Sequence, residues 1–169
     1  QTVTVVDTQN PTITCPADVL NVPADAGQCY ATGVALGSPT TADNCGVATV
    51  TNNAPAQFPV GSTTVTWTVT DIHGNTATCN QTVTVIDTEL PTFTVPADIT
   101  IYKDATCGYN ADVSIIGDVT DEADNCDTSL DATFTDAVAA GTCEGEEIIT
   151  RTWTLTDDCG NTTTHIQII

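Results

Sequence analysis

The sequence predicts an all-β protein: two tandem β-sandwich modules, stapled by disulfides and joined end to end. Valine and isoleucine alternate with threonine over short runs, which places one side of each strand in a core and the other in water. No window has the periodicity of an amphipathic helix. The stretch Gln81–Pro91, QTVTVIDTELP, repeats Gln1–Pro11, QTVTVVDTQNP, so the chain is an array of similar units.

The composition limits where such a protein works and what it binds. Eight cysteines in 169 residues indicate oxidised pairs and a secreted or cell-surface location, because modules this small bury limited cores. The net charge is −20 and the basic residues are Lys103 and Arg151 alone, which excludes nucleic acid as a partner. No apolar run is long enough to span a bilayer, so we expect no membrane insertion of this segment.

Three sequence blocks define the repeat and the module boundaries. The corresponding blocks are Thr12–Cys29 with Thr92–Cys107, Thr41–Gly46 with Glu122–Asp127, and Thr64–Thr76 with Thr150–Thr162. They place residues 7–86 in a first module and residues 87–169 in a second, more divergent one.

Residues 1–6 repeat the last strand of a module, and we assign them to a preceding module or a neighbouring subunit. His165–Ile169 begins that same strand at the other end of the chain. Two explanations fit: a continuous array of modules, or insertion of Gln1–Val6 into the second module of the next subunit. Both imply head-to-tail continuation.

Turn signals separate short strands in each module, which is typical of a sandwich. Trp67 and Trp153 lie mid-strand between threonines, and we expect them to anchor the two cores. Asp71–Asn75 and Asp157–Asn161 are expected hairpin loops. The strands expected in the first module are Asp18–Val22, Cys29–Leu36, Val47–Thr51, Thr63–Thr70 and Thr78–Val85.

The two modules act as controls for each other in assigning the cysteine pairs. Cys15 and Cys79 have no counterparts in the second module, and their joint loss indicates a bonded pair. The prediction is Cys15–Cys79, Cys29–Cys45, Cys107–Cys126 and, by elimination, Cys143–Cys159. A zinc site is the alternative use of these cysteines, but no CxxC spacing supports it.

The blocks DTxxPxITCP, DNCG and FPVGSTTVTWTVTDIHGN resemble the HYR (hyalin repeat) family over almost all of the first module. The second module departs from the pattern, with Val95 and His165 where Cys15 and Cys79 stand. The resemblance implies an immunoglobulin-like β-sandwich with a role in cell-surface adhesion or matrix. Such arrays are found in long bacterial surface adhesins.

In an immunoglobulin-like sandwich, the segment entering the module, the loop between the second and third strands and the last hairpin lie at one pole. Acidic motifs occupy all three places, and clustered carboxylates repel each other without a cation. Calcium, which takes roughly six to eight oxygens, is expected to stiffen the module junction as in cadherins; magnesium demands stricter geometry. The alternative is that these residues only cap turns. The expected ligands are Asp7, Asp43, Asn44, Asp71, Asn75, Asp87, Glu89, Asp121, Asp124, Asn125, Asp127, Asp157 and Asn161.

No pattern typical of a catalytic site is present, so we expect no enzyme. The expected function is a calcium-stiffened segment of a cell-surface fibre or adhesin, joined head to tail to copies of itself or to adjoining repeats. The alternative is an accessory module of a secreted enzyme that binds surface glycans or proteins through residues 139–147. Asn80 and Asn161 begin N-glycosylation patterns.

Overall fold

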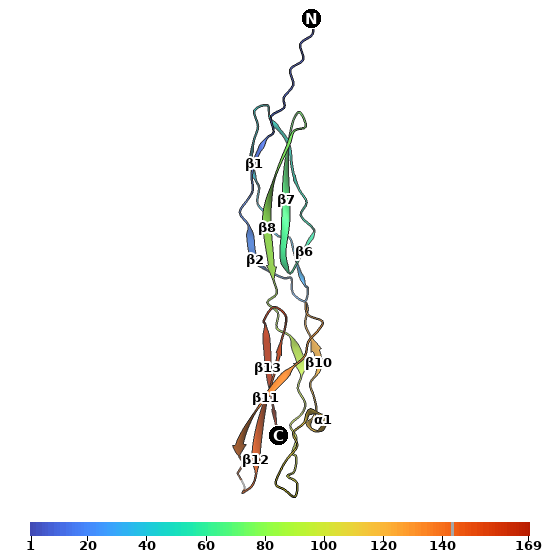
Figure 1. The fold of residues 1–169 in the computed structure, drawn as a ribbon, viewed down its shortest axis with the longest axis vertical. Coiled ribbons are helices and arrows are strands. Elements are labelled where there is room, and N and C mark those ends of the chain that lie inside the picture. Colours follow the sequence, from blue (N-terminus) through green and yellow to red (C-terminus); the bar gives the residue numbers. More distant parts are fainter. Residues whose placement is uncertain (143) are drawn as a thin grey trace. The chain divides into compact units, whose positions relative to one another are not determined.

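The computed structural model describes residues 1–142 and 144–169, and it confirms the all-β fold class. In this part of the chain, no helix has the length and apolar character needed to cross a membrane. The elements, labelled in Figure 1 where there is room, are β1 (Thr12–Thr14), β2 (Val19–Pro23), β3 (Tyr30–Thr32), β4 (Thr40–Ala42), β5 (Val47–Asn52), β6 (Gln57–Pro59), β7 (Gly61–Asp71), β8 (Thr76–Ile86), β9 (Thr92–Thr94), α1 (Val113–Ile116), β10 (Thr120–Ala123), β11 (Thr133–Ala140), β12 (Glu147–Thr156) and β13 (Thr162–Ile168).

The chain divides into two compact units, Gln1–Asp87 and Thr88–Ile169. In the first unit, β2, β8, β7 and β5 form one sheet in that order, and β1–β4 and β3–β6 are short antiparallel pairs. The long strands β7 and β8 form an antiparallel hairpin, whereas β2 runs parallel to β8.

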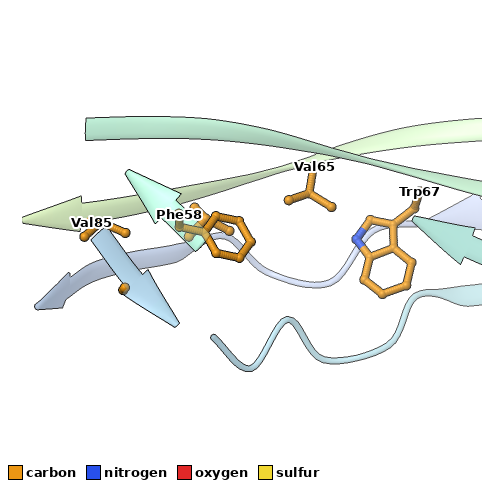
Figure 2. Close-up of a cluster of buried hydrophobic side chains, with 6 residues drawn as sticks. Phe58, Val65, Trp67 and Val85 are labelled. Carbon is orange, nitrogen blue, oxygen red and sulfur yellow. The ribbon is translucent and has the colours of Figure 1, made fainter. Parts of the chain in front are cut away.

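Alternation along β7 and β8 builds the core of the first unit. Val65, Trp67, Val83 and Val85 are buried in one cluster, and Phe58 of β6 packs with them (Figure 2). The threonines between these residues are half-buried or exposed. The period of two therefore gives each strand one apolar face.

The second unit has a smaller sheet and a core in two parts. Strands β11, β12 and β13 form an antiparallel sheet, and β9 pairs with β10. One core cluster contains Phe93, Trp153 and Leu155, and the other contains Ile116, Ile149 and Ile169.

A buried glutamine holds the core tryptophan of the first unit. Trp67 is 7% exposed, as expected for a core anchor, and its Nε1 donates to Oε1 of Gln81 at 3.0 Å. Nε2 of Gln81 donates to the carbonyl oxygens of Ala17 and Leu36, at 2.7 and 2.9 Å. One side chain thus joins β8, β7 and two connecting segments.

The second unit repeats this network with Gln167. Trp153 is 1% exposed and donates to Oε1 of Gln167 at 3.3 Å. Nε2 of Gln167 donates to the carbonyl oxygens of Ala97 and Ile116, each at 3.1 Å. Both core tryptophans predicted from sequence are therefore confirmed, together with a polar partner that was not predicted.

The expected strand Cys29–Leu36 is wrong in extent. Only Tyr30–Thr32 pairs, as β3, with β6. Gly33 has φ of +64°, a left-handed conformation that turns the chain out of the ladder. The short strands β1, β4 and β6 were not expected, because three residues are too few to show an alternation of apolar and polar side chains. The other expected strands of this unit agree closely with β2, β5, β7 and β8.

Among the predicted disulfides, Cys15–Cys79 is confirmed. It joins the residue after β1 to β8 and packs against the core of the first unit. Cys143 lies outside the described residues, so the pairing of Cys143 with Cys159 stays a prediction.

The predicted pairs Cys29–Cys45 and Cys107–Cys126 are wrong. Cys45 and Cys107 are exposed free thiols, whereas Cys29 and Cys126 are each disulfide-bonded. The pairing rested on matching the cysteines between repeats, which shows that positions correspond but not that they are close in space.

The length of β7 explains why Cys29 and Cys45 do not bond. The carbonyl oxygen of Cys29 accepts the N–H of Val60, next to the first residue of β7. Cys45 lies near Asp71, the last residue of β7. A strand of 11 residues spans roughly 33 Å, whereas the Cα atoms of a disulfide lie within about 7 Å.

Candidate metal centre

Three loops of the first unit converge on a group of carboxylates. Asp7 precedes β1, Asp43 lies between β4 and β5, and Asp71 ends β7. One oxygen of each carboxylate lies within 4.8 Å of the other two. The structure thus brings together the three loops that were expected to share a pole.

Two of these carboxylates are oriented by the backbone of their own loops. Oδ1 of Asp71 accepts the N–H groups of His73 and Asn75, both at 2.8 Å. Oδ2 of Asp43 accepts the N–H groups of Cys45 and of the following residue, both at 2.8 Å. Each loop folds around its aspartate because a carboxylate satisfies several turn N–H groups at once.

Asp7 is the third carboxylate of the centre, and a buried oxygen of Asp43 faces it without a hydrogen bond from the described residues. Oδ1 of Asp7 accepts the N–H of Gln9 at 3.0 Å, and Oδ2 lies 3.5 Å from Nδ1 of His73. Oδ1 of Asp43 is buried and accepts no hydrogen bond from the described residues. A buried carboxylate oxygen without a hydrogen-bond donor is costly, and a bound cation would offset that cost.

Hydrogen bonding keeps this centre anionic. The N–H of Gln9 lowers the pKa of Asp7, although partial burial and the charge of Asp71 oppose the shift. Burial raises the pKa of Asp71, but hydrogen bonds from Asn75 and His73 more than offset it, and the pKa lies below its usual value. Both groups are ionised at neutral pH, so their mutual repulsion persists.

A second possible ligand set overlaps the first: Asp7, Cys45 and His73 also have ligand atoms within 4.8 Å of one another. The hydrogen bond to Asp7 and, after it, burial raise the pKa of the Cys45 thiol. The thiol is therefore protonated at neutral pH, whereas zinc binds the thiolate. The oxygen-only set is the better cation centre.

In the sequence of the second repeat, Asp87, Asp124 and Asp157 stand at the positions of Asp7, Asp43 and Asp71. Oδ1 of Asp157 accepts the N–H groups of Cys159 and Asn161, at 2.9 and 2.8 Å, as its counterpart does in the first hairpin. Oδ2 of Asp124 is buried and accepts no hydrogen bond from the described residues.

The predicted amide ligands orient neighbouring groups. Nδ2 of Asn75 and of Asn161 each donates, at 2.7 Å, to the hairpin aspartate four residues earlier. Asn44 and Asn125 each donate to Sγ of the following cysteine at 3.3 Å. These residues therefore shape the loops around the carboxylates.

Three further predicted ligands are not members of the aspartate triads. Asp121 accepts two threonine hydroxyls at 3.4 Å. Asp127 accepts the N–H groups of Ser129 and Asp158, at 2.8 and 3.2 Å, and so fastens the hairpin loop to its neighbour. Glu89 is exposed.

Comparison with known proteins identifies the kind of module. The HYR domain family matches residues 6–85. Hyalin of Strongylocentrotus purpuratus is 40% identical over 97 residues, which are 54% of this chain and 8% of the relative. Hyalin of Lytechinus variegatus is 31% identical over 163 residues, which are 92% of this chain and 30% of the relative. "Sushi, von Willebrand factor type A, EGF and pentraxin domain-containing protein 1" of Rattus norvegicus is 35% identical over 96 residues, 54% of this chain and 3% of the relative.

Proposed function

Since residues 6–85 belong to the HYR domain family, we propose that this chain is a non-enzymatic structural or adhesive repeat of an extracellular or cell-surface protein. The relatives contain similar segments within far longer chains, which supports a repeat that works in an array. The disulfide Cys15–Cys79 fits an oxidising extracellular setting.

The observation that carries the mechanism is the aspartate triad of the first repeat. Three carboxylates gather within 4.8 Å, and a buried oxygen of Asp43 accepts no hydrogen bond from the described residues. We assign Asp7, Asp43 and Asp71 as the ligands of a calcium ion in the first module. Water and backbone carbonyl oxygens complete the roughly six to eight oxygens that calcium takes.

Calcium at this position stiffens the segment that leads into each module. Asp7 directly follows Gln1–Val6, and Asp87 directly follows β8. A bound ion ties this leading residue to two loops of the module, and the backbone there loses conformational freedom. An array of such modules becomes stiffer when calcium is present.

Thermal unfolding in calcium and in chelator tests this proposal. At a calcium concentration near 100 times Kd, binding stabilises the folded state by about 2.7 kcal/mol. For units of this size the melting temperature then rises by roughly 10–20 °C. Magnesium chloride at equal ionic strength is the control, because general screening of the −20 charge acts with either salt. A melting curve that is the same in calcium and in chelator contradicts the proposal.

A further inference from the structure

The sheet of the second unit, labelled β11, β12 and β13 in Figure 1, has an outer face without charge. Trp153 and Leu155 of β12 point into the core, so the alternate residues of the sheet face the other way. None of the side chains on this outer face is ionisable. Strand pairing assigns to it Thr133, Thr135, Ala137, Ala139, Ile148, Thr150, Thr152, Thr154, Thr164, Ile166 and Ile168.

Three isoleucines lie together on the outer face. Ile166 pairs with Thr152, and Ile168 pairs with Thr150. Ile148 is two residues from Thr150 on the same strand and therefore lies diagonally next to Ile168. Ile148 and Ile168 are each 38% exposed, and Ile166 is 58% exposed. Single exposed apolar side chains are common, but a contiguous group of them is typical of an interaction surface.

The first unit is an internal control for this cluster. Trp67 pairs with Cys79 as Trp153 pairs with His165, so the central hairpins of the two units have the same register. At the positions of the three isoleucines, the first unit has Ser62, Asn80 and Thr82. It forms the same hairpin with polar side chains there, which shows that the fold does not require the isoleucines.

The charge of the chain favours one kind of partner for the outer face. The chain has 22 acidic and 2 basic residues, so two copies that meet through acidic surfaces repel each other. The outer face brings no carboxylate into such a contact. A cationic partner would instead be attracted to the acidic loops. A second copy of this chain is therefore the partner that the uncharged face suits.

We propose that the outer face of the second unit binds the same face of a second copy, so that arrays of these repeats associate side by side. The contact is isologous, because each copy contributes the same isoleucines and threonines. The two sheets stack face to face, roughly 10 Å apart, as the layers of a β-sandwich do. Its role rests on the proposed extracellular array, but the contact itself needs no calcium.

The size of the outer face sets the strength of the contact. β11 has 8 residues and β13 has 7. At roughly 3.4 Å per residue and 4.8 Å between strands, the face measures about 25 by 14 Å. Two copies then bury roughly 700–1,000 Å² together, which is at the lower limit of specific interfaces. A single pair is therefore weak and reversible, and several pairs between two arrays hold more firmly through effective concentration.

Analytical ultracentrifugation of the chain in chelator tests the self-association. We expect a reversible dimer that becomes detectable as the concentration approaches about 1 mM. Added sodium chloride should strengthen the dimer, because it screens the repulsion between two copies of net charge −20. A dimer that weakens with salt is held by ion pairs and overturns the proposal. A chain that stays monomeric at about 1 mM also overturns it, and assigns the outer face to a different partner.

A double variant that copies the first unit locates the contact. Ile148→Ser with Ile166→Asn places at both positions the residues of Ser62 and Asn80, which the same hairpin tolerates in the first unit. We expect the dimer Kd to rise at least about ten-fold, because two apolar side chains per copy leave the contact. Leu20→Asn is the control, since Leu20 is 60% exposed but lies on β2 of the first unit. An unchanged Kd in the double variant, or an equal rise in Leu20→Asn, overturns the assignment.

NMR of the wild-type chain tests the same face without any substitution. Amide shifts that change with protein concentration should be confined to β11, β12 and β13 and the turns that join them. Changes confined to the first unit overturn the proposal. Because these experiments are done in chelator, a monomeric chain leaves the melting shift in calcium unaffected, and a chain without that shift still dimerises. The two proposals therefore fail separately.

Discussion

Replacing Gln81 by leucine should destabilise the first unit by removing the hub of a buried network. Gln81 is 0% exposed, and leucine leaves Nε1 of Trp67 and the carbonyl groups of Ala17 and Leu36 without this partner. Each orphaned group costs about 1–3 kcal/mol, so three cost about 3–9 kcal/mol. The more apolar side chain recovers about 1–2 kcal/mol. We expect a net loss of about 3 kcal/mol, or roughly 12–24 °C in melting temperature.

Guanidinium unfolding and calorimetry measure this loss directly. Thr78→Leu, at an exposed position of the same strand, is the matched control and should change stability by less than about 0.5 kcal/mol. Gln167→Leu should lower the stability of the second unit instead, through the equivalent bonds to Trp153, Ala97 and Ile116. If Gln81→Leu unfolds within about 1 kcal/mol of the wild type, the glutamine network does not stabilise the unit as argued.

Three other substitutions or titrations test separate parts of the fold. Replacing Cys15 and Cys79 together by alanine opens a loop with a sequence separation of 64. Denaturant unfolding should show the first unit less stable by about 4 kcal/mol. A loss confined to the second unit contradicts this prediction. Asp136→Asn removes the charge partner of Arg151, which is 1% exposed and donates two hydrogen bonds of 2.7 Å to the Asp136 carboxylate. We expect a loss of about 2–3 kcal/mol in the second unit, and unchanged unfolding refutes it. Hydrogen bonds from the Thr106 side chain and nearby backbone lower the pKa of Asp104. The stability that this carboxylate adds to the folded state is therefore present above the unfolded pKa of 3.8 and is lost as pH falls through the lower folded pKa. A carboxyl-carbon NMR titration with a midpoint at or above 3.8 contradicts the shift.

Alternation was enough to predict the long strands, because burial of one strand face is a local property of the sequence. Val65 and Trp67 in β7, and Val83 and Val85 in β8, lie in the core as their period of two indicates. Gln81 follows the same inward period as these valines, and that position is the signal that identifies it as buried. A polar residue on the apolar face of a strand therefore indicates a buried side chain with hydrogen-bond partners in the core.

The centre and the cysteines show where local patterns stop being sufficient. The aspartates of the hairpins come together because each loop is folded around its own carboxylate, which is readable from Asp71 and Asn75 in sequence. Disulfide partners depend on distances along the strands, and β7 separates Cys29 from Cys45.

Isothermal titration of calcium into the chain tests the central claim most directly. Wild-type protein should bind calcium with Kd of roughly 10⁻⁴ to 10⁻³ M, the range of extracellular modules. Asp43→Asn keeps the side-chain size but removes a charge from the triad, and it should abolish one class of bound ion. Asp131→Asn, at an exposed aspartate outside both triads, should bind as the wild type does. Loss of one class of bound ion in Asp43→Asn, with wild-type binding in Asp131→Asn, is the predicted result; equal binding by all three proteins contradicts a calcium-stiffened repeat.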